Sequence, residues 1–323
     1  MTCSQEHWPI KLINFIKECE QERNLNLNAL EPQLELIADG LSNKNYLLKT
    51  QNSSYVIREN SPQSNAMCNR DNEVICWQTA AAQKLAPELI WLNNDKSYYL
   101  SEFIRQPANK IIEANDTFDL LNQLQQLPKP EREITSQRQW QIYQHQLNQL
   151  IEDIELQLNV TSSHKTEFKQ WMQFVQFLNA KQTNFSAWTD DILASTSELQ
   201  FSHRDLNPDN LLIKDDRLIC IDFEYACAAE PVYDIASAIE SNHFSALDQQ
   251  WLAEKYFANN QKASSCSIKA FPAMQKVYWG FFYYWAAIMA GETLKQMNIK
   301  SSSAKLEDFN RYLNYQHQYQ GKI

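Results

Sequence analysis

The chain has 323 residues, of which 44% are hydrophobic, and carries a formal net charge of -10 with a pI near 5.2. This length and apolar content allow a sizeable core in two lobes or domains and exclude a disordered chain. The acidic balance argues against a nucleic-acid partner and against attraction to anionic lipid surfaces.

The cysteines and the apolar segments indicate where the protein resides. The 7 cysteines are odd in number and include no C-x-x-C pair, which favours a reducing compartment over a disulfide framework or a zinc site. The N-terminus lacks the basic and apolar regions of a secretory signal. The most apolar stretch, 277–290, is shorter than the ~20 residues that span a bilayer. We therefore expect a cytoplasmic protein with no membrane partner, and the sequence does not indicate an oligomeric state.

Apolar periodicity predicts a small sheet-containing region followed by a mainly helical one. A helix is expected at 5–22 and another at about 69–85, which ends shortly before Pro87. Strands are expected at 34–38, 45–50, 55–59, 89–92 and 98–103. The later helices are expected near 115–127, 135–158, 164–180, 232–242, 247–259, 268–298 and 304–319. The pattern predicts an α+β fold with an N-terminal domain at 1–104 and a C-terminal domain at 105–323.

Two features of the N-terminal region could bind an anion. The polar turn Gly40-Leu-Ser42-Asn43 lies between the first two strands, where backbone N–H groups could cap a phosphate, although such a turn is often only a hairpin. The third strand ends in Arg58, whose guanidinium offers a fixed charge with donors. We expect Glu73 on the following helix to pair with Arg58, with Asp71 as the nearby rival, because this order of strand, cation, helix and acid resembles that of kinases.

The sequence HRDLNPDN at 203–210, followed by IDFE at 221–224, has the spacing that phosphoryl-transfer enzymes of the protein-kinase type require. Asp205 suits the role of proton acceptor, and Asn210 with Asp222 suits magnesium binding. The intervening residues read as two short strands around a polar turn, a hairpin that would bring Asp222 back toward Asn210. The alternative is a polar loop and a surface hairpin that carry acids by chance.

These motifs resemble the catalytic loop and the metal-binding motif of kinases, with Glu224 in place of the usual glycine. Together with the turn at Gly40, with Arg58 and with the aromatic C-terminal helices, they are similar to the choline/ethanolamine kinase family. That family includes bacterial thiamine kinase-like proteins and belongs to the aminoglycoside phosphotransferase superfamily. The resemblance runs from about residue 38 to 315 and is least evident at 110–195. It implies a bilobal protein-kinase-like fold that uses ATP and Mg2+ on a small-molecule substrate.

The resemblance also implies roles for individual residues. Residues expected to bind or orient the nucleotide are Gly40, Ser42, Asn43, Arg58, Glu73, Glu102, Phe103 and Ile104. The last three form the hinge, where main-chain groups would meet adenine. His203 belongs to the catalytic motif and is expected to orient the loop around Asp205. Asp234 is expected to support that loop by accepting hydrogen bonds.

The substrate is expected to bind in the C-terminal half, where tryptophan and tyrosine cluster near acids. Such rings could hold a quaternary ammonium or thiazolium group by cation-π attraction, and core packing is the alternative. The candidates are Glu240, Trp279, Tyr283 and Trp285. The resemblance thus implies a kinase for a small cationic alcohol of the choline, ethanolamine or thiamine type. An aminoglycoside or other antibiotic phosphotransferase is the alternative, and the intact motif argues against a non-enzymatic binding module.

Overall fold

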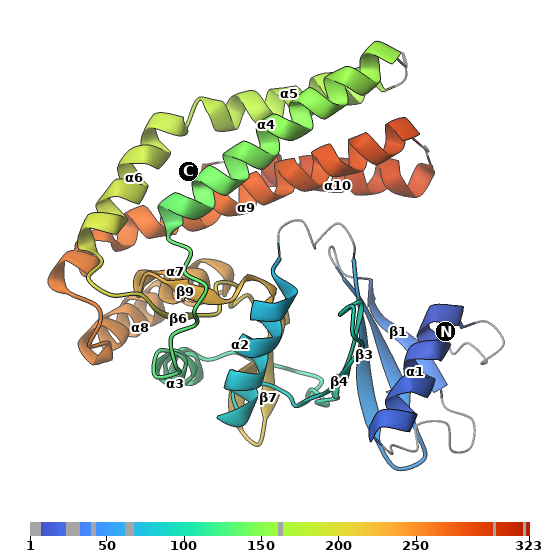
Figure 1. Cartoon of the computed structure of the whole chain (residues 1–323). Coiled ribbons are helices and arrows are strands. Elements are labelled where there is room, and N and C mark those ends of the chain that lie inside the picture. Colours follow the sequence, from blue (N-terminus) through green and yellow to red (C-terminus); the bar gives the residue numbers. More distant parts are fainter. Residues whose placement is uncertain are drawn as a thin grey trace. The chain divides into compact units, whose positions relative to one another are not determined.

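The computed structural model describes residues 8–23, 33–39, 43–61, 68–160, 164–299, 302–318 and 321–323. The chain forms two compact units, and each is described by itself (Figure 1). The first unit comprises Met1–Pro130, His203–Cys227 and Phe244–Leu252, and the second comprises Glu131–Ser202, Ala228–His243 and Ala253–Ile323. The functional division at residues 104 and 105 stays a prediction.

The first unit is built on a five-stranded antiparallel sheet with the order β1-β2-β3-β5-β4. Its strands are β1 (Gln33–Asp39), β2 (Asn43–Lys49), β3 (Ser54–Asn60), β4 (Leu89–Leu92) and β5 (Tyr98–Glu102). Ile57 pairs with Leu100 and Arg58 pairs with Tyr99 across β3 and β5. Because side chains alternate along a strand, the first pair points to one face of the sheet and the second pair to the other.

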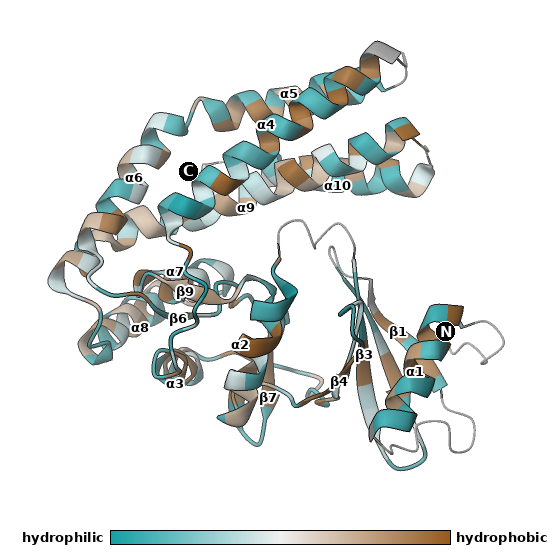
Figure 2. Cartoon of the chain, viewed as in Figure 1, coloured by the Kyte–Doolittle hydropathy of each residue, from teal (hydrophilic) through white to brown (hydrophobic). Residues whose placement is uncertain are grey.

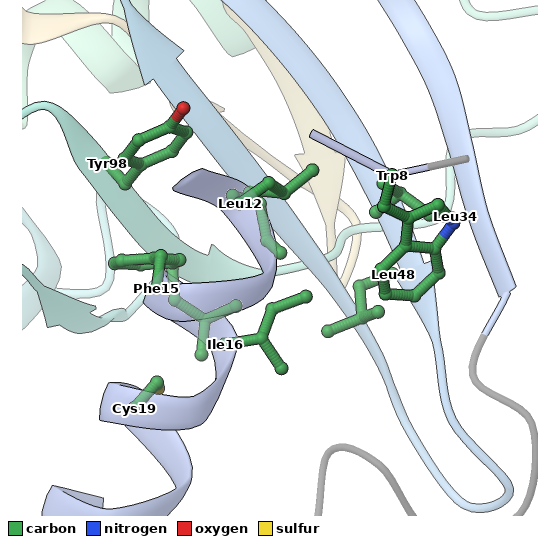
Figure 3. Close-up of a cluster of buried hydrophobic side chains, with 10 residues drawn as sticks. Trp8, Leu12, Phe15, Ile16, Cys19, Leu34, Leu48 and Tyr98 are labelled. Carbon is green, nitrogen blue, oxygen red and sulfur yellow. The ribbon is translucent and has the colours of Figure 1, made fainter. Parts of the chain in front are cut away.

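Helix α1 (Ile10–Arg23) covers the face of the sheet that carries Ile57 and Leu100. Figure 3 shows side chains of the helix directed toward side chains of the strands. Figure 2 shows α1 as a helix of mixed hydropathy, as expected for an element with one buried stripe. The buried apolar cluster consists of Trp8, Leu12, Phe15, Ile16, Cys19, Leu34, Leu48, Ile57, Tyr98 and Leu100. This core covers one face of the sheet and leaves the opposite face, which carries Arg58 and Tyr99, for polar contacts.

Helix α2 (Arg70–Ala82) supplies partners for the other face. It begins at an N-cap, Asn69, whose side chain accepts a hydrogen bond from the Asn72 N–H at 2.9 Å. Within the helix, the Trp77 indole N–H donates at 2.8 Å to the carbonyl of Pro87, which lies beyond the helix end. This contact ties the helix to the segment that leads into β4.

The predicted hairpin is present as β7 (Leu211–Lys214) and β8 (Arg217–Cys220). Asp215 and Asp216, the two residues between the strands, have φ values of 50° and 58°. Two consecutive left-handed residues match the right-handed twist of the flanking strands, and aspartate tolerates this conformation better than most residues. Helix α3 (Ala114–Leu124) completes the helices that lie wholly in the first unit.

The second unit is mainly helical. Its helices are α4 (Ser136–Val160), α5 (Lys165–Asn179), α6 (Gln182–Ser195), α7 (Val232–Ser241), α9 (Ser265–Ile299) and α10 (Ser303–Gln318), while α8 (Ala246–Asn259) is divided between the units. The two short strands β6 (Gln200–Ser202) and β9 (Cys227–Ala229) pair with each other. Among the described residues, no helix combines the length and the hydropathy needed to cross a membrane.

Helix α6 was not predicted, because its segment is rich in threonine, asparagine and serine and carries a weak apolar pattern. Its position depends on packing against α9. Phe185 of α6 lies where the side chain of any larger residue at Gly280 would be, since a Cβ there would come within 1.8 Å of the ring. The close approach of the two helices therefore requires glycine at this position.

The core under α1 allows a matched test of burial with two isoleucines of one helix. Ile16 is 2% exposed and Ile10 is 77% exposed. We expect Ile16→Ala to lower the free energy of unfolding by about 3 kcal/mol, because it removes buried methyl groups and leaves a cavity. Ile10→Ala should change it by less than about 0.5 kcal/mol. Equilibrium urea denaturation measures both, and equal losses would show that α1 does not pack on the sheet in this way.

Candidate active site

The loop at 203–210 holds the Asp205 carboxylate between two amide donors. Asn207 Nδ2 donates to Asp205 Oδ1 at 2.9 Å, and Asn210 Nδ2 donates to Asp205 Oδ2 at 2.9 Å. Asn207 Oδ1 accepts from the backbone N–H groups of Asp209 and Asn210 and so caps a 3-10 turn, Pro208–Asn210. Both carboxylate oxygens therefore have a fixed donor, and two of the predicted site residues lie in direct contact.

His203 is fully buried and orients the start of the loop. Its Nε2 lies 3.0 Å from the Ile221 carbonyl, and its Nδ1 accepts from the Asp205 N–H at 3.4 Å. A neutral ring with its proton on Nε2 satisfies both contacts. The ring also packs edge-on against Phe223, with centroids 4.7 Å apart. These contacts fit a positioning role, in which His203 holds the loop rather than the reacting atoms.

The β7–β8 hairpin returns the chain to the loop at Asp222. The Ile221 N–H donates to the Asn210 carbonyl at 2.9 Å, which places Asp222 beside the loop as the hairpin predicted. Asp222 has φ 68° and ψ 69°, and Arg204 in the loop has φ 71°. Left-handed conformations cost energy in residues other than glycine and persist where surrounding contacts impose them, often at functional sites. Here one of them directly precedes Asp205 and the other is Asp222 itself.

Asn210 and Asp222 have donor atoms that fit Mg2+, because they supply an amide oxygen and a carboxylate. Mg2+ in nucleotide sites usually takes one or two protein ligands and completes its octahedron with phosphates and water. Within the described part of the chain, no group of three or more His, Cys, Asp or Glu residues could hold a metal ion. Asn210 and Asp222 could therefore hold Mg2+ only in a site with few protein ligands.

Arg58 is a buried cation, 6% exposed, at the centre of an ion-pair cluster in the first unit. Its Nη2 lies 2.7 Å from Glu73 Oε1 on α2, and its Nη1 donates to Asp222 Oδ1 at 2.9 Å. Its Nε donates to Asn60 Oδ1 at 2.8 Å. Burial by itself lowers the pKa of Arg58, but Glu73, Asp222 and Glu224 together raise that pKa above its ordinary value. The guanidinium is therefore charged at every accessible pH.

The partner of Arg58 is Glu73 and not the rival Asp71. Glu73 is fully buried, whereas the Asp71 side chain is 79% exposed and pairs with Lys96 at 2.7 Å. The periodicity of α2 explains the choice, because residues two apart on a helix face different directions. The expected cation and helix glutamate thus lie together in the structure, while their role toward a nucleotide stays a prediction.

Two further residues of the cluster, Arg70 and Glu224, were missed as site residues. Arg70 Nη1 donates to Glu73 Oε2 at 2.7 Å and lies 3.5 Å from Glu224 Oε2. Asn43 Nδ2 donates to the same Glu224 oxygen at 3.0 Å. Arg70 stands three residues before Glu73, a spacing that places both on one helix face, and this was the available signal. Glu224 was visible only as a departure from the kinase motif.

Burial raises the pKa of two carboxyl groups, Asp205 in the loop and Glu224 in the ion-pair cluster. The pKa of Asp205 rises to about 6, chiefly through burial, with hydrogen bonds from Asn207 and Asn210 opposing and Asp222 adding to the shift. The pKa of Glu224 rises to about 7, again through burial first and the nearby Asp222 carboxylate second, while Arg58 opposes the shift. At neutral pH Asp205 is therefore ionised and able to accept a proton.

The predicted hinge follows β5 and is attached to the hairpin. Lys214 Nζ donates to both carboxylate oxygens of Glu102, at 2.6 and 2.7 Å. Gln106 exchanges hydrogen bonds with the backbone of Ile213, at 2.9 and 3.2 Å. Phe103 and Ile104 lie between these anchors. The segment is thus held by its flanking side chains, and recognition of a base by its main-chain groups stays a prediction.

The predicted anion-binding turn is only partly described. Gly40 and Ser42 lie outside the described residues. Asn43 is 5% exposed, and besides its bond to Glu224 it accepts a hydrogen bond from the Ser61 N–H at 3.3 Å. It therefore connects the end of this turn to the ion-pair cluster and to the chain that leaves β3.

Asp234 lies on α7 in the second unit and is 2% exposed. Its Oδ1 accepts a hydrogen bond from Ser202 Oγ at 2.6 Å. Ser202 is the last residue of β6 and directly precedes His203. The donor lies in the strand that leads into the loop and not in the loop itself, so support of the loop by Asp234 stays a prediction.

The four predicted substrate residues belong to the second unit and fall into different surroundings. Glu240 of α7 accepts from the Trp279 indole N–H at 2.6 Å, so these two lie together. Tyr283 is fully buried, and its ring contacts Phe174 and Phe177 of α5. These contacts are those of a core residue. Trp285 lies half-buried in a group of aromatic rings that also includes Phe282, Tyr312 and Tyr315.

The shared Glu73 carboxylate yields a prediction about stability. We expect Glu73→Gln to lower the free energy of unfolding by about 3–5 kcal/mol, because two buried guanidinium groups lose their common partner. The matched control is Asp71→Asn, which removes an exposed carboxylate two residues away and should change the same quantity by less than about 1 kcal/mol. Urea denaturation of the two variants measures both values. Comparable losses would contradict the central place of Glu73.

Comparison with known proteins places the chain in a family. Residues 33–266 match the phosphotransferase enzyme family. The protein LicA of Haemophilus influenzae is 23% identical over 263 residues, which cover 78% of this chain and 71% of that protein. Choline kinase LicA from Streptococcus pneumoniae has a similar solved structure, with a TM-score of 0.58 at 16% identity over 96% of this chain and 100% of that one. An ethanolamine kinase of Plasmodium vivax gives 0.60 at 16% identity over 98% and 91%.

At this identity the solved structures establish the fold, and they confirm the predicted α+β class with an antiparallel N-terminal sheet and a mainly helical remainder. The family match extends over more than half of the sequence. The chain therefore belongs to the phosphotransferase enzyme family.

Proposed function

We propose that this protein is an ATP-dependent kinase that phosphorylates the hydroxyl group of a small cationic alcohol of the choline or ethanolamine type. The observation that carries the proposal is the grouping of Asp205, Asn210 and Asp222 with the buried pair of Arg58 and Glu73, all within the first unit. A proton acceptor, oxygen ligands and a fixed cation are the groups that phosphoryl transfer from a nucleotide needs.

Asp205 would accept the proton of the attacking hydroxyl. Its carboxylate is ionised at neutral pH and is held by Asn207 and Asn210, so its orientation is set before a substrate arrives. A bound Mg2+, held by Asn210 and Asp222, would supply positive charge for the phosphates. Arg58 would add a second fixed charge, because Glu73 holds its guanidinium in place while leaving it charged.

Several observations support a cationic acceptor. The net charge of -10 favours positively charged ligands in general. In the second unit, the carboxylate of Glu240 lies beside the Trp279 ring, and half-buried rings of Phe282, Trp285 and Tyr315 contact one another. Carboxylates and exposed aromatic faces are the groups that attract organic ammonium ions. The relatives include proteins named as choline and ethanolamine kinases.

An acceptor panel tests the proposal directly. We expect ADP formation from MgATP to be stimulated by choline or ethanolamine, with weaker effects of thiamine, neutral sugars and aminoglycosides. A coupled ADP-release assay measures the rates, and mass spectrometry identifies the phosphorylated product. Stimulation by aminoglycosides alone would replace this proposal with the antibiotic phosphotransferase alternative, and no stimulation by any acceptor would reject the choline and ethanolamine class.

Two variants of the same loop separate catalysis from folding in that assay. Asp205→Asn should lower kcat by roughly 10²–10⁴-fold while MgATP binding is largely retained, because the proton acceptor is lost but the metal ligands remain. Asp209→Asn is the control, since Asp209 is exposed and lies in the adjacent turn. Near wild-type turnover of Asp205→Asn would refute the role of Asp205.

The raised pKa of Asp205 predicts the pH dependence. Since the carboxylate must be ionised to accept a proton, kcat/KM should fall as pH drops through about 6 and should level off above it. If Asp205 had the pKa of an ordinary aspartate, kcat/KM would stay unchanged down to about pH 4. Steady-state rates between pH 5 and 8 distinguish the two cases, and a flat profile over this range would show that Asp205 does not control the rate.

A further inference from the structure

The last three residues of the chain contact helices of the second unit. Gly321 has φ 99°, a conformation that residues with a side chain rarely adopt. The Ile323 carbonyl accepts a hydrogen bond from Lys181 Nζ at 3.1 Å. Lys322 lies between these two residues and directs its side chain to α7 and α9, as the following distances show.

The ammonium group of Lys322 occupies a site with two attractive partners. Its Nζ lies 4.9 Å from the centroid of the Trp279 ring and 3.5 Å from Glu240 Oε2. The carboxylate is fixed by two other donors, Trp279 Nε1 to Oε2 and Gln275 Nε2 to Oε1, each at 2.6 Å. The Glu240 side chain is only 14% exposed. An oriented carboxylate next to an aromatic face is an arrangement that receives an organic ammonium ion.

Lys322 is held less closely than two other paired lysines, Lys295 and Lys214. Its distance of 3.5 Å to Glu240 exceeds the 2.6 Å between Lys295 and Asp153 and between Lys214 and Glu102. Its side chain is also 49% exposed. An exposed ion pair and an exposed cation-π contact each contribute little to stability. The ammonium group of Lys322 can therefore be displaced by another cation.

We propose that Lys322 occupies the binding site for the ammonium group of the acceptor and competes with that ligand. The inference rests on the proposed function, because the cationic acceptor supplies the ligand class. Glu240 and Trp279 attract either cation, and only one can fill the position that both partners define. Lys322 therefore acts as a specificity-determining residue, which lowers the affinity for ammonium ligands and has no such effect on neutral ones.

Equilibrium binding to the full chain tests the competition. Titration calorimetry with choline or ethanolamine should give a Kd about tenfold lower for Lys322→Gln than for the unaltered protein, since both weak contacts of the competing lysine are gone. Lys322→Arg should show no such gain, because it keeps the positive charge. Choline's neutral analogue 3,3-dimethylbutan-1-ol should bind the protein and its Lys322→Gln variant alike.

Two further variants locate the effect. Glu240→Gln should weaken binding of both ammonium ligands, and in that background Lys322→Gln should no longer tighten it. Lys276→Gln is the matched control, because Lys276 is an exposed lysine over another tryptophan, Trp188, at 5.5 Å. It should leave every Kd unchanged.

The outcomes separate this inference from the proposed function. An unchanged Kd of Lys322→Gln for an ammonium ligand that the protein binds overturns the competition and leaves the cationic acceptor in place. An equal gain for the neutral analogue also overturns it, because removal of Lys322 would then act without regard to charge. If no variant binds an ammonium ligand while MgATP still binds, the acceptor class and the competition fail together.

Discussion

The buried guanidinium of Arg58 is the constraint on which the first unit depends. A cation with 6% exposure loses its hydration, and this loss is tolerable only because Glu73 and Asp222 replace the water. Among the described residues, the cluster contains two arginines and three carboxylates, with Arg70 and Glu224 as the other members. When Glu224, whose pKa is raised to about 7, is ionised together with Glu73 and Asp222, these carboxylates exceed the arginines by one charge. A divalent metal ion would reverse that excess and favour the phosphates of a nucleotide.

Because Arg58 must face its carboxylate partners, the register of β3 in the sheet is fixed. In β3, Ile57 and Arg58 are neighbours in sequence but point to opposite faces, toward the core under α1 and toward α2 respectively. Across the strand, Leu100 and Tyr99 repeat the same division. A shift of one residue would place Arg58 in the apolar core and Ile57 among the carboxylates. Packing of α1 therefore keeps the cation on the side where its partners lie.

The features that could be predicted from the sequence are those with a local pattern or a recognisable motif. The hairpin around Asp215 follows from turn chemistry. The pairing of Arg58 with Glu73 was expected from the resemblance to kinases, and helix geometry explains why Asp71 is not the partner. Helix α6 was missed because its weak pattern is completed only by Phe185 packing at Gly280. The contact between Asn43 and Glu224 joins positions 181 apart, and no local periodicity reports a contact of that kind. Long-range polar contacts are thus the part of the site that required the structure.

Glu224 shows why a kinase-like motif can dispense with glycine here. The left-handed conformation at this point belongs to Asp222, with φ 68°, and is imposed by its surroundings. Residues Phe223–Tyr225 then form a 3-10 turn, and none of them has a positive φ. The position after Phe223 therefore needs no glycine and can carry a side chain. That side chain accepts from Asn43 and lies near Arg70, so it links the start of β2 and α2 to the segment that follows β8.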